Sequence, residues 1–74
     1  MCLGVPAKVV EFVEGQMAVV DVDGNQVNIS IQLVPEVKIG QYVLVHAGFA
    51  MDIVDEDWAK ETMQLLKQLQ PQPQ

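Results

Sequence analysis

The sequence predicts a mainly β protein: a small barrel of about five strands followed by one C-terminal α-helix. Short β-branched segments alternate with turn residues as far as residue 54, and the stretch with helical periodicity follows them. The 74 residues provide room for one compact domain. We therefore expect a single domain over residues 1–69 and a flexible tail over residues 70–74, which read Gln-Pro-Gln-Pro-Gln.

The first two strands are predicted over Lys8–Val13 and Met17–Val22, where β-branched and other apolar residues predominate. Residues 14–16, Glu-Gly-Gln, are typical of the turn between them. After the second strand, Asp23-Gly24 is a strong hairpin signal, because a tight primed turn needs positive φ angles that Asp and Gly tolerate. The connections on both sides of the second strand are therefore predicted to be short hairpin turns.

A third strand follows the Asp-Gly turn and has an alternating pattern. Val27, Ile29 and Ile31 are separated by single polar residues. This period of two predicts one buried face and one solvated face. Leu33–Gly40, which contains Pro35, is predicted to be a loop.

The fourth and fifth strands are predicted over Gln41–Ala47 and Phe49–Val54. Gly48 lies between them, and a glycine in this position indicates a bulge or a sharp bend. Such bends allow one sheet to curl onto itself. Short strands with mostly hairpin-length connections predict an OB-like barrel, either closed or partly open.

The helix is predicted to begin after Asp55, whose side chain is suited to cap the first turn. Acidic residues at positions 55–57 also suit the positive end of the helix dipole. The helix should end before Pro71. Its apolar stripe, at steps of three and four residues, is predicted to contain Trp58, Thr62, Leu65, Leu66 and Leu69.

Composition excludes several classes of function. Half of the residues are hydrophobic, which is typical of a folding chain, and the formal net charge is −6 without any arginine. Phosphate backbones repel such a chain, so no nucleic-acid partner is expected. The sequence has neither a long apolar run nor a signal-peptide pattern, and its single cysteine cannot form an internal disulfide. We therefore expect a cytoplasmic protein without a membrane partner.

The residues available for chemistry are few, so an enzyme is not expected. The one cysteine is Cys2, and a thiolate is a soft ligand for iron, copper(I) or zinc. The one histidine is His46, in the fourth predicted strand. Without further information, Cys2 is more often an incidental small hydrophobe than a functional thiol, and His46 is more often a structural histidine than a ligand. Because stable sites use about four ligands, a metal held by these two would need donors from elsewhere, which favours a carrier or a shared site.

Two motifs resemble a known family. Residues 1–6, Met-Cys-Leu-Gly-Val-Pro, followed by Lys8-Val9, resemble the N-terminal signature of the HypC/HupF/HybG family of [NiFe]-hydrogenase maturation chaperones. Residues 45–51, Val-His-Ala-Gly-Phe-Ala-Met, resemble the second conserved segment of that family. One departure is visible, since Ala7 stands where the family commonly has glycine. An alanine there would strain the chain if the position required positive φ or close backbone approach.

The resemblance implies a small OB-like chaperone that is not an enzyme. It implies two partners, a HypD-type maturation protein and the [NiFe]-hydrogenase large-subunit precursor. It also implies a transient cargo, iron carrying cyanide and carbon monoxide, Fe(CN)2CO, with no permanently bound cofactor. Cys2 would be an iron ligand and His46 a second contributor to the metal site. The residues implied to contact partners are Cys2, Leu3, Val5, Pro6, His46 and Phe49.

Three other functions stay open at this point. The first is a metal-free adaptor in the same maturation complex, in which Cys2 contacts only protein. The second is a single-stranded nucleic-acid OB module, although two Phe, one Tyr, one Trp and four Lys offer few stacking platforms and little positive charge. The third is a thiol-redox protein, which would need a resolving cysteine from its partner.

Overall fold

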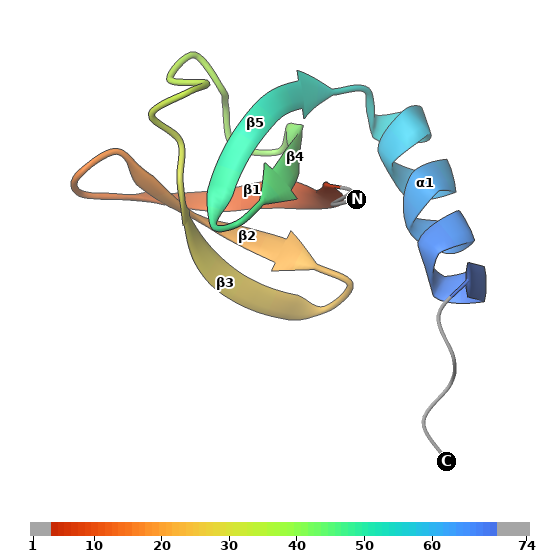
Figure 1. Cartoon of the computed structure of the whole chain (residues 1–74). Coiled ribbons are helices and arrows are strands. Elements are labelled where there is room, and N and C mark those ends of the chain that lie inside the picture. The colour runs from red at the N-terminus through yellow and green to blue at the C-terminus, as the bar shows by residue number, and fades with distance from the viewer. Residues whose placement is uncertain (1–3, 70–74) are drawn as a thin grey trace.

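Five strands close into a barrel in the computed structural model, which describes residues 4–69 (Figure 1). The order around the barrel is β1-β2-β3-β5-β4, and β4 pairs back onto β1. All neighbours are antiparallel except β3 and β5. The prediction of a mainly β, five-stranded OB-like barrel with a C-terminal helix is confirmed, whereas the predicted tail lies outside the described residues. The elements are β1 (Val5–Val13), β2 (Met17–Val22), β3 (Asn25–Ser30), β4 (Tyr42–His46), β5 (Phe49–Val54) and α1 (Glu56–Leu69).

The β2–β3 hairpin has the predicted tight turn. Asp23 and Gly24 have φ angles of 52° and 91°, as a primed two-residue turn requires. The backbone N–H of Gly24 donates a 2.7 Å hydrogen bond to Oδ1 of Asp21. The Asp-Gly prediction is therefore confirmed, and a side chain before the turn further stabilises it.

Strand β1 begins at Val5, three residues before the predicted start at Lys8. Proline lacks the N–H donor of a sheet ladder and is therefore uncommon inside a sheet. However, β1 pairs with β2 only from Lys8 onward, so around Pro6 it has β4 as its one sheet neighbour. Proline is tolerated at such an edge. The extra residues matter because they carry the N-terminal signature into the sheet.

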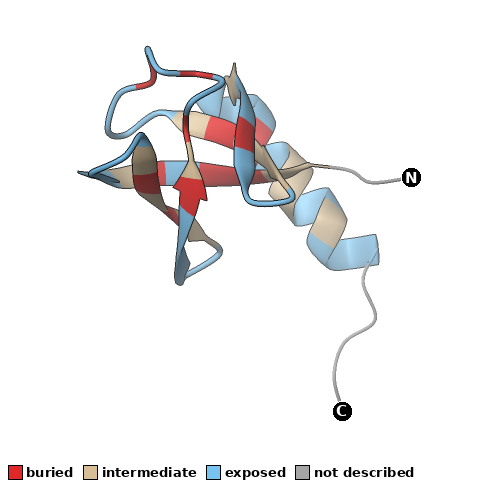
Figure 2. Cartoon of the chain, turned by 60° about the vertical axis from the view of Figure 1, so that its left-hand side comes forward, coloured by how far each residue is buried: buried red, intermediate tan, exposed pale blue. Residues whose placement is uncertain are grey.

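The core is built from small and branched side chains (Figure 2). In residues 4–69 no buried residue is polar or charged. Two core residues, Val34 and Val37, come from the loop predicted over residues 33–40, which folds over the barrel interior. The buried cluster of the barrel consists of Ala7, Val9, Ala18, Val20, Ile29, Ile31, Val34, Val37, Val43 and Ala50.

The alternation predicted for the third strand is only partly correct. Ile29 and Ile31 are buried as expected, but Val27 is 44% exposed. Its partner in the β2 register, Val20, is fully buried. The difference arises because β3 pairs with β5 only through Ser30 opposite Phe49, so no strand of the barrel covers Val27 on the β5 side.

Asp55 caps α1 as predicted. Its Oδ2 accepts hydrogen bonds from the backbone N–H groups of Asp57 at 3.0 Å and Trp58 at 3.2 Å. Its carbonyl oxygen accepts a 2.8 Å bond from the N–H of Ala59, which begins the helical ladder. Two of the donors that a helix N-terminus leaves unpaired are therefore satisfied by one side chain.

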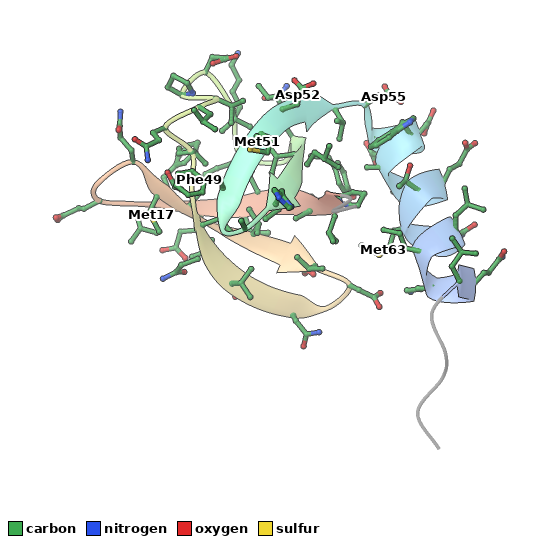
Figure 3. The ribbon with its side chains drawn as sticks, in the orientation of Figure 1. Met17, Phe49, Met51, Asp52, Asp55 and Met63 are labelled. Atoms are coloured by element: carbon green, nitrogen blue, oxygen red, sulfur yellow. The ribbon has the colours of Figure 1, made fainter. Side chains whose placement is uncertain are left out.

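The packed face of α1 differs from the predicted stripe. The helix contacts β1 and β4 through buried Ala59 and half-buried Thr62, Met63 and Leu66. Figure 3 shows Met63 on the side of α1 that faces the barrel. The predicted residues Trp58, Leu65 and Leu69 are instead exposed, by 44%, 58% and 78%. Both stripes follow helical spacing and share positions 62 and 66, so periodicity alone does not distinguish them.

Replacing Asp55 with alanine should lower the free energy of unfolding by about 1 kcal/mol, because the first turn of α1 loses its cap. Urea denaturation monitored by circular dichroism measures this change. Asp55→Asn is the matched control, since asparagine caps nearly as well. Equal losses in the two variants would contradict the capping role.

Candidate functional site

A two-residue turn joins β4 to β5 and brings two predicted site residues together. Ala47 and Gly48 both have positive φ, 55° and 83°, and His46 lies opposite Phe49 in the register. The bend predicted at Gly48 is therefore a tight hairpin turn. A bulge occurs further along β5 instead. Val45 pairs with Ala50 and the next residue of β4, Leu44, pairs with Asp52, so β5 has one extra residue between these two pairs.

His46 belongs to an outward-facing row of side chains across the barrel. His46 is opposite Phe49, Phe49 is opposite Ser30, and Ser30 is opposite Met17. Register partners share one face of a sheet, and the neighbouring Ala18, Ile29 and Ala50 point inward and are buried. Phe49 is 38% exposed, and Figure 3 shows it on β5 close to Met51, which is 49% exposed. The imidazole thus lies at the end of a partly apolar surface.

The start of β1 runs beside the strand that ends in His46. Val5 lies opposite Val45, and Pro6 lies opposite Leu44. Because this pairing is antiparallel, the chain at Gly4 reaches the end of β4 that carries His46. The predicted site residues Cys2 and Leu3 lie outside the described residues. Their role remains a prediction.

Gly4 leaves room for the side chain of Leu44, which the sequence did not indicate. A Cβ atom at this position would lie within 3.0 Å of the side chain of Leu44. Such a contact is closer than side-chain carbons tolerate, so either Leu44 or the chain would have to move. The backbone at Gly4 therefore packs closely against the Leu44 side chain.

Ala7 occupies a position where its side chain fits without strain. Ala7 is 1% exposed and lies opposite Val43 in the middle of the β1–β4 ladder. The φ angle of Ala7 is not positive. The methyl group therefore contributes to the core, and this position does not require a glycine.

Pro6 is buried in β1 and lines a groove of about 360 Å³ between the barrel and α1. Three of the four lysines of this acidic chain, Lys8, Lys60 and Lys67, line the same groove. Nζ of Lys67 lies 2.7 Å from Oδ1 of Asp23, which links the helix to the β2–β3 turn. The groove is thus partly occupied by contacts that hold the helix against the barrel.

Glu56 and Lys60 form an ion pair along α1. Nζ of Lys60 donates to Oε2 of Glu56 at 2.8 Å. This hydrogen bond lowers the pKa of the Glu56 carboxyl and raises the pKa of the Lys60 ammonium group. Both side chains are well exposed, so the pair adds little to stability.

Over residues 4–69, no three His, Asp or Glu side chains gather in a group that could hold a metal ion. His46 is therefore the one predicted metal ligand whose position is described, and its partner Cys2 lies outside that range. The pairing of Phe49 with His46 could have been deduced from the sequence, because Ala47-Gly48 has the length of a tight hairpin turn. The contact between Gly4 and Leu44 could not have been deduced from the sequence, because the two residues meet only through the pairing of β1 with β4.

The five-stranded barrel and the C-terminal helix agree with the OB-like architecture that the resemblance implied. A family profile described as the HupF/HypC family matches residues 1–66. The chain belongs to this family of hydrogenase maturation chaperones. In the described residues no helix is both long and apolar enough to cross a membrane.

Similar proteins carry names that agree with this family. The chain is 44% identical over 70 residues to hydrogenase maturation factor HypC of Helicobacter hepaticus, covering 93% of this chain and 81% of the relative. It is 45% identical over 75 residues to hydrogenase maturation factor HybG of Escherichia coli K12, covering 93% and 92%. It is also 39% identical to HypC of Cupriavidus necator, covering 95% and 78%. These matches span nearly the whole chain.

Replacing Gly4 with alanine should lower the free energy of unfolding by about 1 to 3 kcal/mol, because the new methyl group collides with Leu44. The double variant Gly4→Ala/Leu44→Ala provides the control, since removing the Leu44 side chain should remove most of the added penalty. Urea denaturation of the four proteins gives the coupling energy. Strict additivity would show that the close approach is not the cause.

Proposed function

We propose that this chaperone carries the iron unit Fe(CN)2CO during [NiFe]-hydrogenase maturation, with Cys2 as its iron ligand. It binds a HypD-type maturation protein while the iron acquires its diatomic ligands. It then binds the hydrogenase large-subunit precursor and delivers the iron to it. The protein works in the cytoplasm as a carrier and catalyses no reaction itself.

The pairing of β1 with β4 is the observation that most supports this proposal. It brings Gly4 to the end of the sheet where His46 and Phe49 face outward. Cys2 lies two residues before Gly4 in the sequence, and two residues span at most about 7 Å, so its thiol can serve the same site as the imidazole.

The chemistry of the cargo explains why so few protein ligands are sufficient. Cyanide and carbon monoxide occupy several positions on the iron, so one or two protein donors complete its coordination. A thiolate is a suitable soft donor. A ligand near the chain end can exchange its metal with a partner thiol while the core stays folded. These properties suit a carrier that must release what it binds.

Formation of the thiolate couples iron binding to proton release. A free cysteine has a pKa of about 8.5, so the thiol is mostly protonated at neutral pH. The positive charge of the metal or of a partner favours the thiolate, and a proton leaves as the bond forms. Iron binding should therefore strengthen as the pH rises toward the pKa of the thiol.

His46 and Phe49 have complementary roles in the proposed site. The imidazole contributes a ligand or a hydrogen bond beside the iron, and Phe49 provides an apolar contact for the partner. Val5 is half-buried at the start of β1, on the other face of the sheet from His46, and offers the partner a separate apolar contact. Leu3 and Pro6 are further contacts for the partner in this proposal.

Replacing Cys2 with alanine should leave the barrel folded but reduce hydrogenase activity to background, because the iron has lost its protein ligand. The measurement is hydrogenase activity in cells that lack every other chaperone of this family. His46→Ala should retain part of the activity, because the thiolate remains. Full activity with Cys2→Ala would refute the proposed role of the thiol.

The wild-type chaperone, purified anaerobically with its HypD-type partner and then separated from it, should show infrared bands of bound cyanide and carbon monoxide. The same preparation of Cys2→Ala should show none. A wild-type protein that binds its partner normally but lacks these bands would be a metal-free adaptor. Because the measurement detects the ligands themselves, it separates the two functions directly.

A further inference from the structure

Strand β3 has an edge that the barrel leaves largely unpaired. On one side, all six of its residues pair with β2. On the other side, within the described residues, only Ser30 pairs with β5, opposite Phe49. Figure 1 shows β3 and β5 diverging from this point. The remainder of β3 is therefore an edge strand within a barrel that is otherwise closed.

Two hydrogen bonds fix the direction of the backbone groups along this edge. The N–H of Ser30 donates to the carbonyl of Gly48 at 2.9 Å, toward β5. The N–H of Ile31 donates to the carbonyl of Gln16 at 2.8 Å, toward the β2 side. Because successive residues of a strand direct these groups to opposite sides, Gln26 and Asn28 share the direction of Ser30. Their N–H and C=O groups point away from β2, toward a side where no strand within residues 4–69 pairs with them.

The β3 edge lacks the devices that usually protect exposed edges. Natural proteins place lysine, proline or a bulge on such strands to prevent further pairing. Strand β3 reads Asn-Gln-Val-Asn-Ile-Ser, without charge or proline, and its register with β2 has no irregularity. By contrast, β5 carries an irregularity and Asp52. An unprotected edge of this kind suits the addition of another strand.

Val27 supplies an apolar contact for such a strand. It faces the barrel interior, on the same face as buried Ile29, yet it is 44% exposed. A strand paired with Gln26–Asn28 would place one of its own side chains beside Val27 on the inner face. An apolar residue at that position would extend the core by one layer.

We infer that the β3 edge binds an extended, cationic segment of a partner protein as an additional strand. Gln26 and Asn28 provide the main-chain hydrogen bonds, and an apolar residue of the segment covers Val27. The chain has a net charge of −6, and Asp21 lies opposite Gln26 on the outer face of the barrel. Lysine or arginine on the outer face of the segment therefore complements this surface. A second copy of the chain is the poorer occupant, because the two net charges would repel each other.

A synthetic peptide tests this inference without iron and without a maturation partner. The probe is a capped heptapeptide of alternating lysine and valine, titrated into the isotopically labelled protein at low salt and followed by NMR. We expect saturable shifts along β3 in the millimolar range, and amide exchange at Gln26 and Asn28 that slows by about tenfold. The same peptide with every backbone nitrogen methylated keeps its charge and should not bind to this edge.

Two variants at one position separate main-chain from side-chain contacts. Asn28→Ala keeps the outward N–H and should bind the peptide as the wild type does. Asn28→Pro removes that N–H without breaking a bond to β2 and should weaken binding several-fold. If the proline variant does not fold, the methylated peptide still decides the question.

Three results would overturn the inference. The first is the absence of shifts on β3 or equal binding of the methylated peptide. The second is slow exchange of Gln26 and Asn28 in the free monomer, since another part of this chain would then cover the edge. The third is a dimer joined through β3, which would identify a second copy as the occupant. None of these results bears on the iron-carrying role of Cys2, because the experiment contains no metal.

Discussion

The pairing of β1 with β4 is the constraint on which the arrangement of the site depends. It joins the first strand of the sequence to the fourth and closes the sheet on itself. Val5 opposite Val45 sets the position of the N-terminal signature relative to the histidine hairpin. Gly4 permits the close approach to Leu44 that this register requires. A shift by one residue would exchange the buried and exposed faces of β1 and separate the two motifs.

The sequence alone was sufficient to predict those parts of the structure that depend on local interactions. The turn at Asp23-Gly24 and the cap at Asp55 follow from the backbone preferences of single residues, and both were predicted. Contacts between distant segments were harder to predict. The exposure of Val27 depends on where β5 leaves β3, and the packed face of α1 depends on the barrel surface beneath it. For the candidate site, the residue types were predicted, but the approach of Gly4 to Leu44 required the three-dimensional structure.

The core and the exposed functional features use different residues. The buried cluster is apolar throughout, and buried side-chain polar atoms without a hydrogen-bond partner are absent from residues 4–69. His46 and Phe49 lie at the end of a hairpin, outside that cluster. Small core side chains such as Ala7 and Val43 allow the strands to curl tightly. A barrel of this size can therefore vary its surface while its stability comes from an independent set of residues.

The position of Trp58 determines what optical spectroscopy can detect in this protein. It is the only tryptophan, and it lies half-exposed on the first turn of α1, outside the buried cluster of the barrel. The only tyrosine, Tyr42, lies in β4. Indole emission therefore reports the environment of the helix, whereas the Tyr42 phenol lines the groove between the barrel and α1 and reports the contact between them. Detachment of the helix should therefore change both signals together in one unlabelled sample.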